Sequence, residues 1–253
     1  MRYKITLSYS GADFRGWQIQ PHDPSVQQTL QDALTKLLGT EISVTGAGRT
    51  DTGVNAINYA AHFDFSGKIE SSELRYKLNA ILPASIAISE IISVTDDFHA
   101  RFGATKREYT YFLHTVKDPF LTKSSLLCHY PLDFDAMNRA AADLAGTHDF
   151  SCFEKTGADN KTSICTVYEA GWHRYTPSHL LVTGNQSDNY WYFKISADRF
   201  LRNMVRATVG TLLEIGRGKR SVDSVGALLA TGDRCQAGES VPGYPLFLSD
   251  IKY

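Results

Sequence analysis

The order in which hydrophobic patterns follow one another constrains the fold of this chain more than any other feature. Residues 3–9 alternate apolar and polar side chains, as a half-buried strand does. Ser25, with Gln28 three residues later, predicts the start of a helix, and Gly39 predicts its end. The pattern then predicts strands at 42–46 and 56–65, a helix marked by Leu74, Leu78 and Ile81, and a strand led by residues 86–88. This order, β-α-β-β-α-β, is that of a ferredoxin-like fold.

The second half of the chain repeats the α+β order without repeating the sequence. Its predicted elements are strands at 105–115, 163–173, 179–184, 189–197 and 246–251, and helices at 135–144, 199–215 and 221–230. No Pro- or Ser-rich linker separates the halves. We therefore expect an α+β protein with two ferredoxin-like halves, residues 1–104 and 105–253, whose antiparallel sheets join across a central positively charged cleft.

A short polar run, Gly48-Arg49-Thr50-Asp51-Thr52-Gly53-Val54, connects two of the predicted strands. Its glycines allow positive φ values or a close approach of a ligand to the backbone. A carboxylate presented in this way can act as a nucleophile, a base or a metal ligand, and Arg49 would keep it ionised. The same residues also suit an Asx-turn, in which Asp51 caps a backbone amide. The local sequence leaves both interpretations open.

Three other enzyme classes fit this run poorly. The tripeptide Asp51-Thr52-Gly53 occurs in aspartic proteases, but these need a second such carboxylate and the chain has no other Asp-Thr-Gly or Asp-Ser-Gly. Gly46-Ala47-Gly48 begins like a dinucleotide-binding fingerprint but lacks its third glycine. A glycosidase needs a partner acid, and the sequence selects neither Glu41 nor Asp64 for that role.

Metal, redox and membrane signals are weak throughout the chain. The cysteines and the histidines His22, His62, His99 and His148 form no pairs at metal-ligand spacing. No apolar run approaches the roughly 18 residues that span a bilayer, and the N-terminus lacks the apolar core of a signal peptide. We expect a cytoplasmic protein with inert thiols, no metal, no cofactor and no membrane contact. The cysteines are Cys128, Cys152, Cys165 and Cys235.

Basic residues are concentrated in two segments, although the net charge of the chain is only −1. Residues 199–220 hold six Lys and Arg side chains against the single acid Glu214, and residues 99–107 hold three against none. Such segments suggest a localised anionic ligand, but ordinary solvated faces would have the same composition. Arg199, Arg202 and Arg206 are spaced to share one face of the predicted helix at 199–215.

Several motifs fall into a known order along the chain. The motifs are Gly16-Trp17-Gln18-Ile19-Gln20, Ser25-Val26-Gln27, the run at 48–54, Asp97-Phe98-His99-Ala100-Arg101-Phe102, Lys106-Arg107-Glu108-Tyr109-Thr110-Tyr111 and Met204-Val205-Arg206. With them, the chain resembles the bacterial tRNA pseudouridine synthases of the TruA type over nearly its whole length.

The resemblance implies that Asp51 is the catalytic carboxylate of an isomerase that converts uridine to pseudouridine without a cofactor. The carboxylate would attack uracil C6 or ribose C1′, or assist glycal formation, and the residues do not choose among these. Arg206 matches the position that pairs with this Asp, and Arg49 the position that fills the space left by a flipped base. Tyr109 matches the aromatic residue that stacks on the target base. From periodicity alone, Tyr109 would be a strand-core residue.

The family also suggests partners. Its members are homodimers that modify positions 38, 39 and 40 in the anticodon stem-loop of tRNA, so we expect tRNA and a second copy as partners. A non-catalytic tRNA-binding or tRNA-folding chaperone is the alternative. The basic residues expected to contact RNA are Arg101, Lys106, Arg107 and Arg202, whereas Phe98 and Phe102 are expected in the core.

Four features depart from the family pattern. Asn55 stands where a His is common, and Lys161 and Tyr168 each stand where an Arg is frequent. The run Pro242-Gly243-Tyr244-Pro245-Leu246 replaces a Pro-x-His-Gly-Leu-like sequence, so the closing loop must bend differently. These departures bear on tRNA affinity and site choice rather than on the reaction class.

Overall fold

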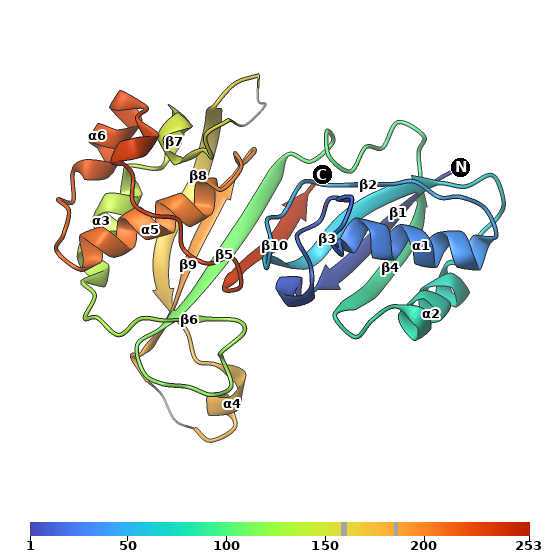
Figure 1. Ribbon diagram of the computed structural model, residues 1–253, viewed down its shortest axis with the longest axis horizontal. Coiled ribbons are helices and arrows are strands. Elements are labelled where there is room, and N and C mark those ends of the chain that lie inside the picture. Colours follow the sequence, from blue (N-terminus) through green and yellow to red (C-terminus); the bar gives the residue numbers. More distant parts are fainter. Residues whose placement is uncertain (158–160, 185–186) are drawn as a thin grey trace. The chain divides into compact units, whose positions relative to one another are not determined.

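The computed structural model describes residues 1–157, 161–184 and 187–253, and it confirms the α+β class (Figure 1). Contacts divide the chain into two units, Met1–Lys106 with Phe247–Tyr253, and Arg107–Leu246. The closing strand, which we assigned to the second half, is thus grouped with the first unit. The joining of two sheets across a charged cleft stays a prediction. Within the described ranges, no helix has the length and apolarity needed to cross a membrane.

The first unit is built in the predicted order. Strand β1 (Arg2–Tyr9) lies between β4 (Ile86–Val94) and β3 (Asn55–Asp64), antiparallel to both. Strand β2 (Val44–Gly46) pairs with the end of β3, and β10 (Leu246–Lys252) runs parallel to its start. The alternation predicted for residues 3–9 is real, because Tyr3, Ile5, Leu7 and Tyr9 are all buried.

Two helices cover this sheet, α1 (Val26–Leu38) and α2 (Ser71–Ile81) (Figure 1). Ser25 Oγ accepts a hydrogen bond from Gln28 N at 3.2 Å, which confirms the predicted N-cap. The Gln28 side chain instead donates to Asp32, so the reciprocal half of the capping box is not formed. Gly39 ends α1 with φ 69°, as predicted. Burial of Val26, Leu30, Leu34, Leu74 and Leu78 holds the helices in place.

The main strands of the second unit follow the order β5-β9-β8-β7 with antiparallel neighbours. Helix α3 packs against β8, α5 and α6. The strands are β5 (Lys106–His114), β6 (Leu126–Leu127), β7 (Gly146–Asp149), β8 (Ile164–Arg174) and β9 (Tyr190–Ala197), and the helices are α3 (Phe134–Ala142), α4 (Ser178–Leu181), α5 (Met204–Gly216) and α6 (Ser224–Thr231).

Two predicted elements of this unit were wrong. Residues 179–184 do not form a strand, because α4 begins there and Leu180 N donates to Pro177 O. The long helix begins at Met204 rather than at residue 199, because Asn203 takes a left-handed conformation with φ 68°. Arg199 and Arg202 therefore lie before the helix and do not share a face with Arg206.

Candidate active site

The run with Asp51 is a tight loop between β2 and β3 of the first unit. Its side chains differ in exposure: Thr50 is buried, Arg49 and Thr52 are exposed, and Asp51 is half-buried. The loop thus keeps Thr50 inside and leaves the Arg49 guanidinium and part of Asp51 accessible. Arg49 and Asp51 lie on the same loop, and their roles stay predictions.

The segment Gly11–Trp17 fixes the backbone of this loop. Trp17 N donates to Thr50 O at 3.2 Å, and Gly53 N donates to Phe14 O at 3.4 Å. The two backbones approach so closely that a Cβ on Gly16 would lie 2.3 Å from Thr50 O. Gly16 also has φ 99°, which only glycine adopts readily. The Gly16-Trp17 motif is therefore needed to hold the loop.

Three buried aromatic residues, Tyr9, Trp17 and Tyr59, pack beneath the surface and contact the loop or one another. Tyr9 Oη lies 2.8 Å from Thr50 Oγ1 in a buried hydrogen bond. The Tyr59 hydroxyl accepts from Gly48 N at 3.2 Å and donates to Gly48 O. The Trp17 and Tyr59 rings pack with centroids 4.3 Å apart, and the Tyr9 ring lies 5.6 Å from that of Tyr59. Sequence analysis missed Tyr9 and Tyr59, because alternation marks them only as strand residues.

Asn55 has a structural role in the same loop. Its side chain is 4% exposed, and its Oδ1 accepts a hydrogen bond from Gly11 N at 2.9 Å. Within the loop, Asp51 O accepts from Val54 N at 3.1 Å, so a backbone bond closes the turn. Asn55, which stands where the sequence pattern led us to expect a His, thus holds the loop against the turn at Gly11–Asp13.

In the second unit, Tyr109 lies on β5 opposite Ile195 of β9. Tyr111 and Leu113, which alternation places on the same face, are fully buried, whereas Tyr109 is only half-buried. Its ring packs edge-to-face on Phe200, with centroids 5.0 Å apart. Tyr109 is therefore the accessible end of a buried stripe, a position that suits a stacking residue.

Arg206 lies in the first turns of α5 and is half-buried. Its Nε donates to Val241 O at 2.7 Å, and Val241 N donates to Arg206 O at 3.2 Å. The segment that ends at Val241 packs directly on α5, because a Cβ on Gly210 would lie 1.8 Å from Glu239 O. These contacts fix the guanidinium from one side.

Tyr111 interacts electrostatically with both Arg206 and Tyr244, and neither tyrosine was predicted as a site residue. Burial raises the pKa of the Tyr111 hydroxyl above its ordinary value; Tyr244 adds to this rise and Arg206 opposes it. The hydroxyl has no hydrogen-bond partner among the described residues. Burial also raises the pKa of Tyr244. Both phenols therefore stay protonated near neutral pH.

A family model described as tRNA pseudouridine synthase matches residues 7–103 and 140–253. The chain belongs to the tRNA pseudouridine synthase family. It is 46% identical to a tRNA pseudouridine synthase A of Bacteroides fragilis, over all of this chain and 96% of that protein. The corresponding protein of Parabacteroides distasonis is 47% identical, with the same coverage, and that of Latilactobacillus sakei is 37% identical, over all of this chain and 98% of that protein. The resemblance to this family of isomerases is thus confirmed.

The predicted RNA-binding residues of this family member are divided between the units. Arg101 is exposed and Lys106 half-buried in the first unit. In the second, Arg202 is exposed, whereas Arg107 donates from its guanidinium to Asp198 O at 2.9 Å. One N–H donor of Arg107 is thus used in a hydrogen bond within the protein.

The exposure of the cysteines agrees only in part with the expectation that their thiols are inert. Cys128, Cys152 and Cys165 are buried, and burial raises the pKa of Cys152 and of Cys165 to about 12. Cys235 is exposed.

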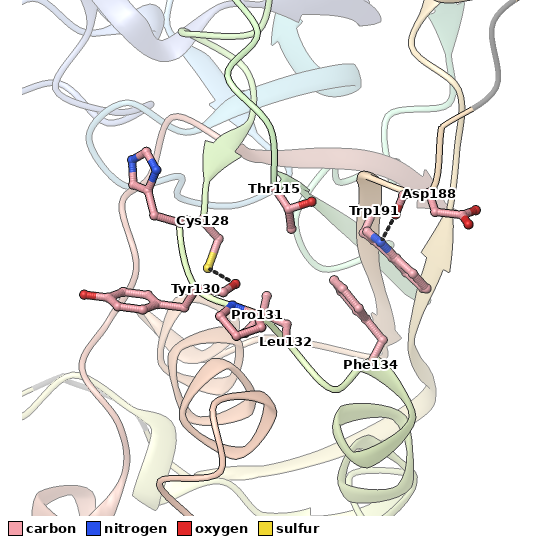
Figure 2. Close-up of a pocket in the computed structure, with 9 residues that line it drawn as sticks. Thr115, Cys128, Tyr130, Pro131, Leu132, Phe134, Asp188 and Trp191 are labelled. Atoms are coloured by element: carbon pink, nitrogen blue, oxygen red, sulfur yellow. Dashed lines mark hydrogen bonds between the residues drawn. The ribbon is translucent and has the colours of Figure 1, made fainter.

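A pocket of about 390 Å³ lies in the second unit (Figure 2). Phe134 and Trp191 stack along one side with ring centroids 3.7 Å apart, and the indole N–H donates to Asp188 O. Cys128 and Tyr130 line the other side. No predicted site residue is among the described residues that line it.

Proposed function

We propose that this protein converts uridine to pseudouridine at positions 38, 39 and 40 of the tRNA anticodon stem-loop, with Asp51 as the nucleophile. The observation that carries the proposal is the construction of the Asp51 loop, whose backbone is fixed on both sides of the carboxylate by Thr50 O and Gly53 N. A loop held in this way keeps a nucleophile in one orientation, which lowers the entropic cost of reaction.

The isomerisation breaks one bond and forms another within the same nucleotide. The bond between ribose C1′ and uracil N1 breaks, the base rotates, and a bond forms between C1′ and C5. C5 loses its hydrogen to solvent and N1 gains one. We propose that Asp51 assists this exchange, that Arg206 supports the carboxylate, and that Tyr109 stacks on the base. The target atoms are inaccessible in a stacked stem, so the base must turn out of the stack, at a cost of a few kcal/mol. Arg49 would fill the space that the base leaves.

The test uses unmodified tRNA transcripts tritiated at uridine C5. Wild type should release tritium, carbodiimide mapping should place the product at 38–40, and Asp51→Asn should release almost none while keeping its far-UV spectrum. Asp13→Asn removes the same charge from an exposed residue of the neighbouring turn and should release tritium at the wild-type rate. Release by Asp51→Asn above about a tenth of wild type would contradict the nucleophile assignment.

The same assay separates the isomerase from a tRNA-folding chaperone. A chaperone would bind the transcript without releasing tritium, and loss of Asp51 would not weaken that binding. For the base-stacking role, Tyr109→Phe should keep most of the rate and Tyr109→Leu should lose it, because only the former keeps an aromatic face. Wild-type rates in both variants would contradict the stacking role of Tyr109. We also propose that the chain acts in the cytoplasm as a homodimer, which sedimentation would test.

A further inference from the structure

The loop between β4 and β5 carries an aromatic side chain that folding does not bury. Phe102, which we expected in the core, is 76% exposed, while Ala100 two residues earlier is fully buried. The Arg101 guanidinium lies 5.5 Å from the centre of the Phe102 ring. The loop therefore presents a flat apolar ring with a cation beside it.

The loop is fixed by hydrogen bonds rather than by burial of Phe102. His99 Nδ1 accepts from both Arg101 N and Phe102 N at 3.1 Å, and Gly103 N donates to His99 O at 2.8 Å. Ala100 is held on both sides, because its N donates to His62 Nδ1 and its O accepts from Tyr253 Oη.

These contacts orient the Phe102 ring as well as the backbone. The ring packs against the His99 imidazole, with centroids 4.4 Å apart and planes at 35°, and most of its remaining surface faces solvent. His99 in turn lies 4.9 Å from the His62 ring. An aromatic side chain supported from behind loses little conformational entropy when a second flat ring stacks on it.

Charge decides what kind of partner suits this surface. No acidic residue occurs from Phe98 to Arg107, whereas Arg101, Lys106 and Arg107 are basic. Two copies of such a loop would repel each other, so the surface does not favour contact with the same loop of a second copy. A partner with flat rings and regularly spaced negative charges is complementary to it, and single-stranded nucleic acid has both.

We propose that Phe102 stacks on an unpaired nucleobase of the RNA substrate, away from the target base, while Arg101 contacts an adjacent phosphate. This rests on the proposed function in that the RNA is taken to be tRNA. The contact provides affinity and register without reading a base edge, since every base has a face on which to stack.

The test measures binding of an unmodified, fluorescently labelled tRNA transcript at several salt concentrations. Phe102→Ala should weaken binding by about 5-fold to 100-fold with an unchanged salt dependence, because a stacked base releases no counterions. Phe102→Trp should bind within about twofold of wild type, since stacking is kept. Arg101→Gln should lower the slope of log affinity against log salt by about one.

Two controls separate stacking from other effects. Phe120 is also 76% exposed but lies beside Asp118, and Phe120→Ala should bind as wild type does. A fully paired RNA of equal length should bind Phe102→Ala and wild type equally, because it offers no unpaired base.

The proposal falls if Phe102→Ala binds the transcript as wild type does, or if it loses equal affinity for transcript and duplex. It also falls if the variant changes the sedimentation coefficient of the free protein, which would mark a protein contact. Tritium release by wild type is scored separately. If wild type released no tritium but Phe102→Ala still weakened binding, the proposed isomerase activity would be contradicted and the proposed stacking site would stand.

Discussion

Tyr9 Oη and Thr50 Oγ1 lie 2.8 Å apart in a buried hydrogen bond that joins strand β1 to the residue before Asp51. The bond holds the buried Thr50 in place beside the half-buried Asp51. A strand residue of ordinary appearance thus restrains the backbone next to the candidate nucleophile. The relationship can be tested without altering any residue proposed to touch RNA.

Thr50→Val should lower kcat by about tenfold to a hundredfold with little change in KM, because Asp51 would lose its fixed orientation. The free energy of unfolding should fall by about 1 kcal/mol for the lost hydrogen bond. Thr52→Val makes the same chemical change at the exposed neighbour and should leave both quantities near wild type. Equal kinetics in the two variants, measured by tritium release, would show that the bond does not orient Asp51.

Gly16→Ala should destabilise the first unit by about 3 kcal/mol or more, because strain at positive φ adds to a steric clash. The added Cβ would lie 2.3 Å from Thr50 O. Gly39→Ala is the matched control, since Gly39 also has positive φ but no atom within 4 Å of the added Cβ. It should cost only about 1 kcal/mol. Urea denaturation measures both, and equal losses would mean that the close approach to the loop contributes nothing.

Arg206→Ala should reduce kcat by about a hundredfold or more while the Kd for tRNA changes less than about threefold. Arg202→Ala should do the reverse: weaker binding, a salt slope lower by about one, and unchanged kcat at saturation. The reason is that Arg206 is half-buried and fixed by Val241 O, whereas Arg202 is exposed before α5. If both variants affect only binding, Arg206 is a phosphate contact.

His62 should make stability depend on pH. Its pKa is lowered from the ordinary 6.5 to about 4, chiefly by burial and also by Arg2 and His99, while Asp64 opposes the shift. Between these values the unfolded chain binds more protons than the folded one, so stability present above pH 6.5 is lost as the pH falls towards 4. The loss from pH 7 to pH 5 should be about 2 kcal/mol at most.

His62→Gln provides the control for this effect. Gln keeps an acceptor for Ala100 N but does not titrate, so urea midpoints at pH 7 and pH 5 should lie closer together than in wild type. His114, whose pKa burial also lowers, is present in both proteins and cancels in the comparison. An unchanged difference between the two pH values would mean that folding does not lower the pKa of His62.

Local sequence patterns predicted the helices and strands of this protein correctly where a local property alone sets their ends. Ser25 and Gly39 bound α1 because capping and left-handed φ are local properties. The helix at 199–215 began too early in the prediction because Asn203 interrupts it, and nothing in the basic residues around it signals a left-handed turn. Residues 179–184 are apolar enough for a strand, but Pro177 starts a helical turn there.

The sequence by itself determined the family and the presence of Asp51, Tyr109 and Arg206, because motifs are read along the chain. Only the tertiary structure decided that Tyr9, Gly16 and Asn55 fix the Asp51 loop, since their contacts join segments about 40 residues apart. It also decided that Phe102 is exposed although its neighbour Ala100 is buried. Hydrophobicity marks which side chains favour the core, but local hydrogen bonds, such as those that His99 Nδ1 accepts from Arg101 N and Phe102 N, determine which of them reach it.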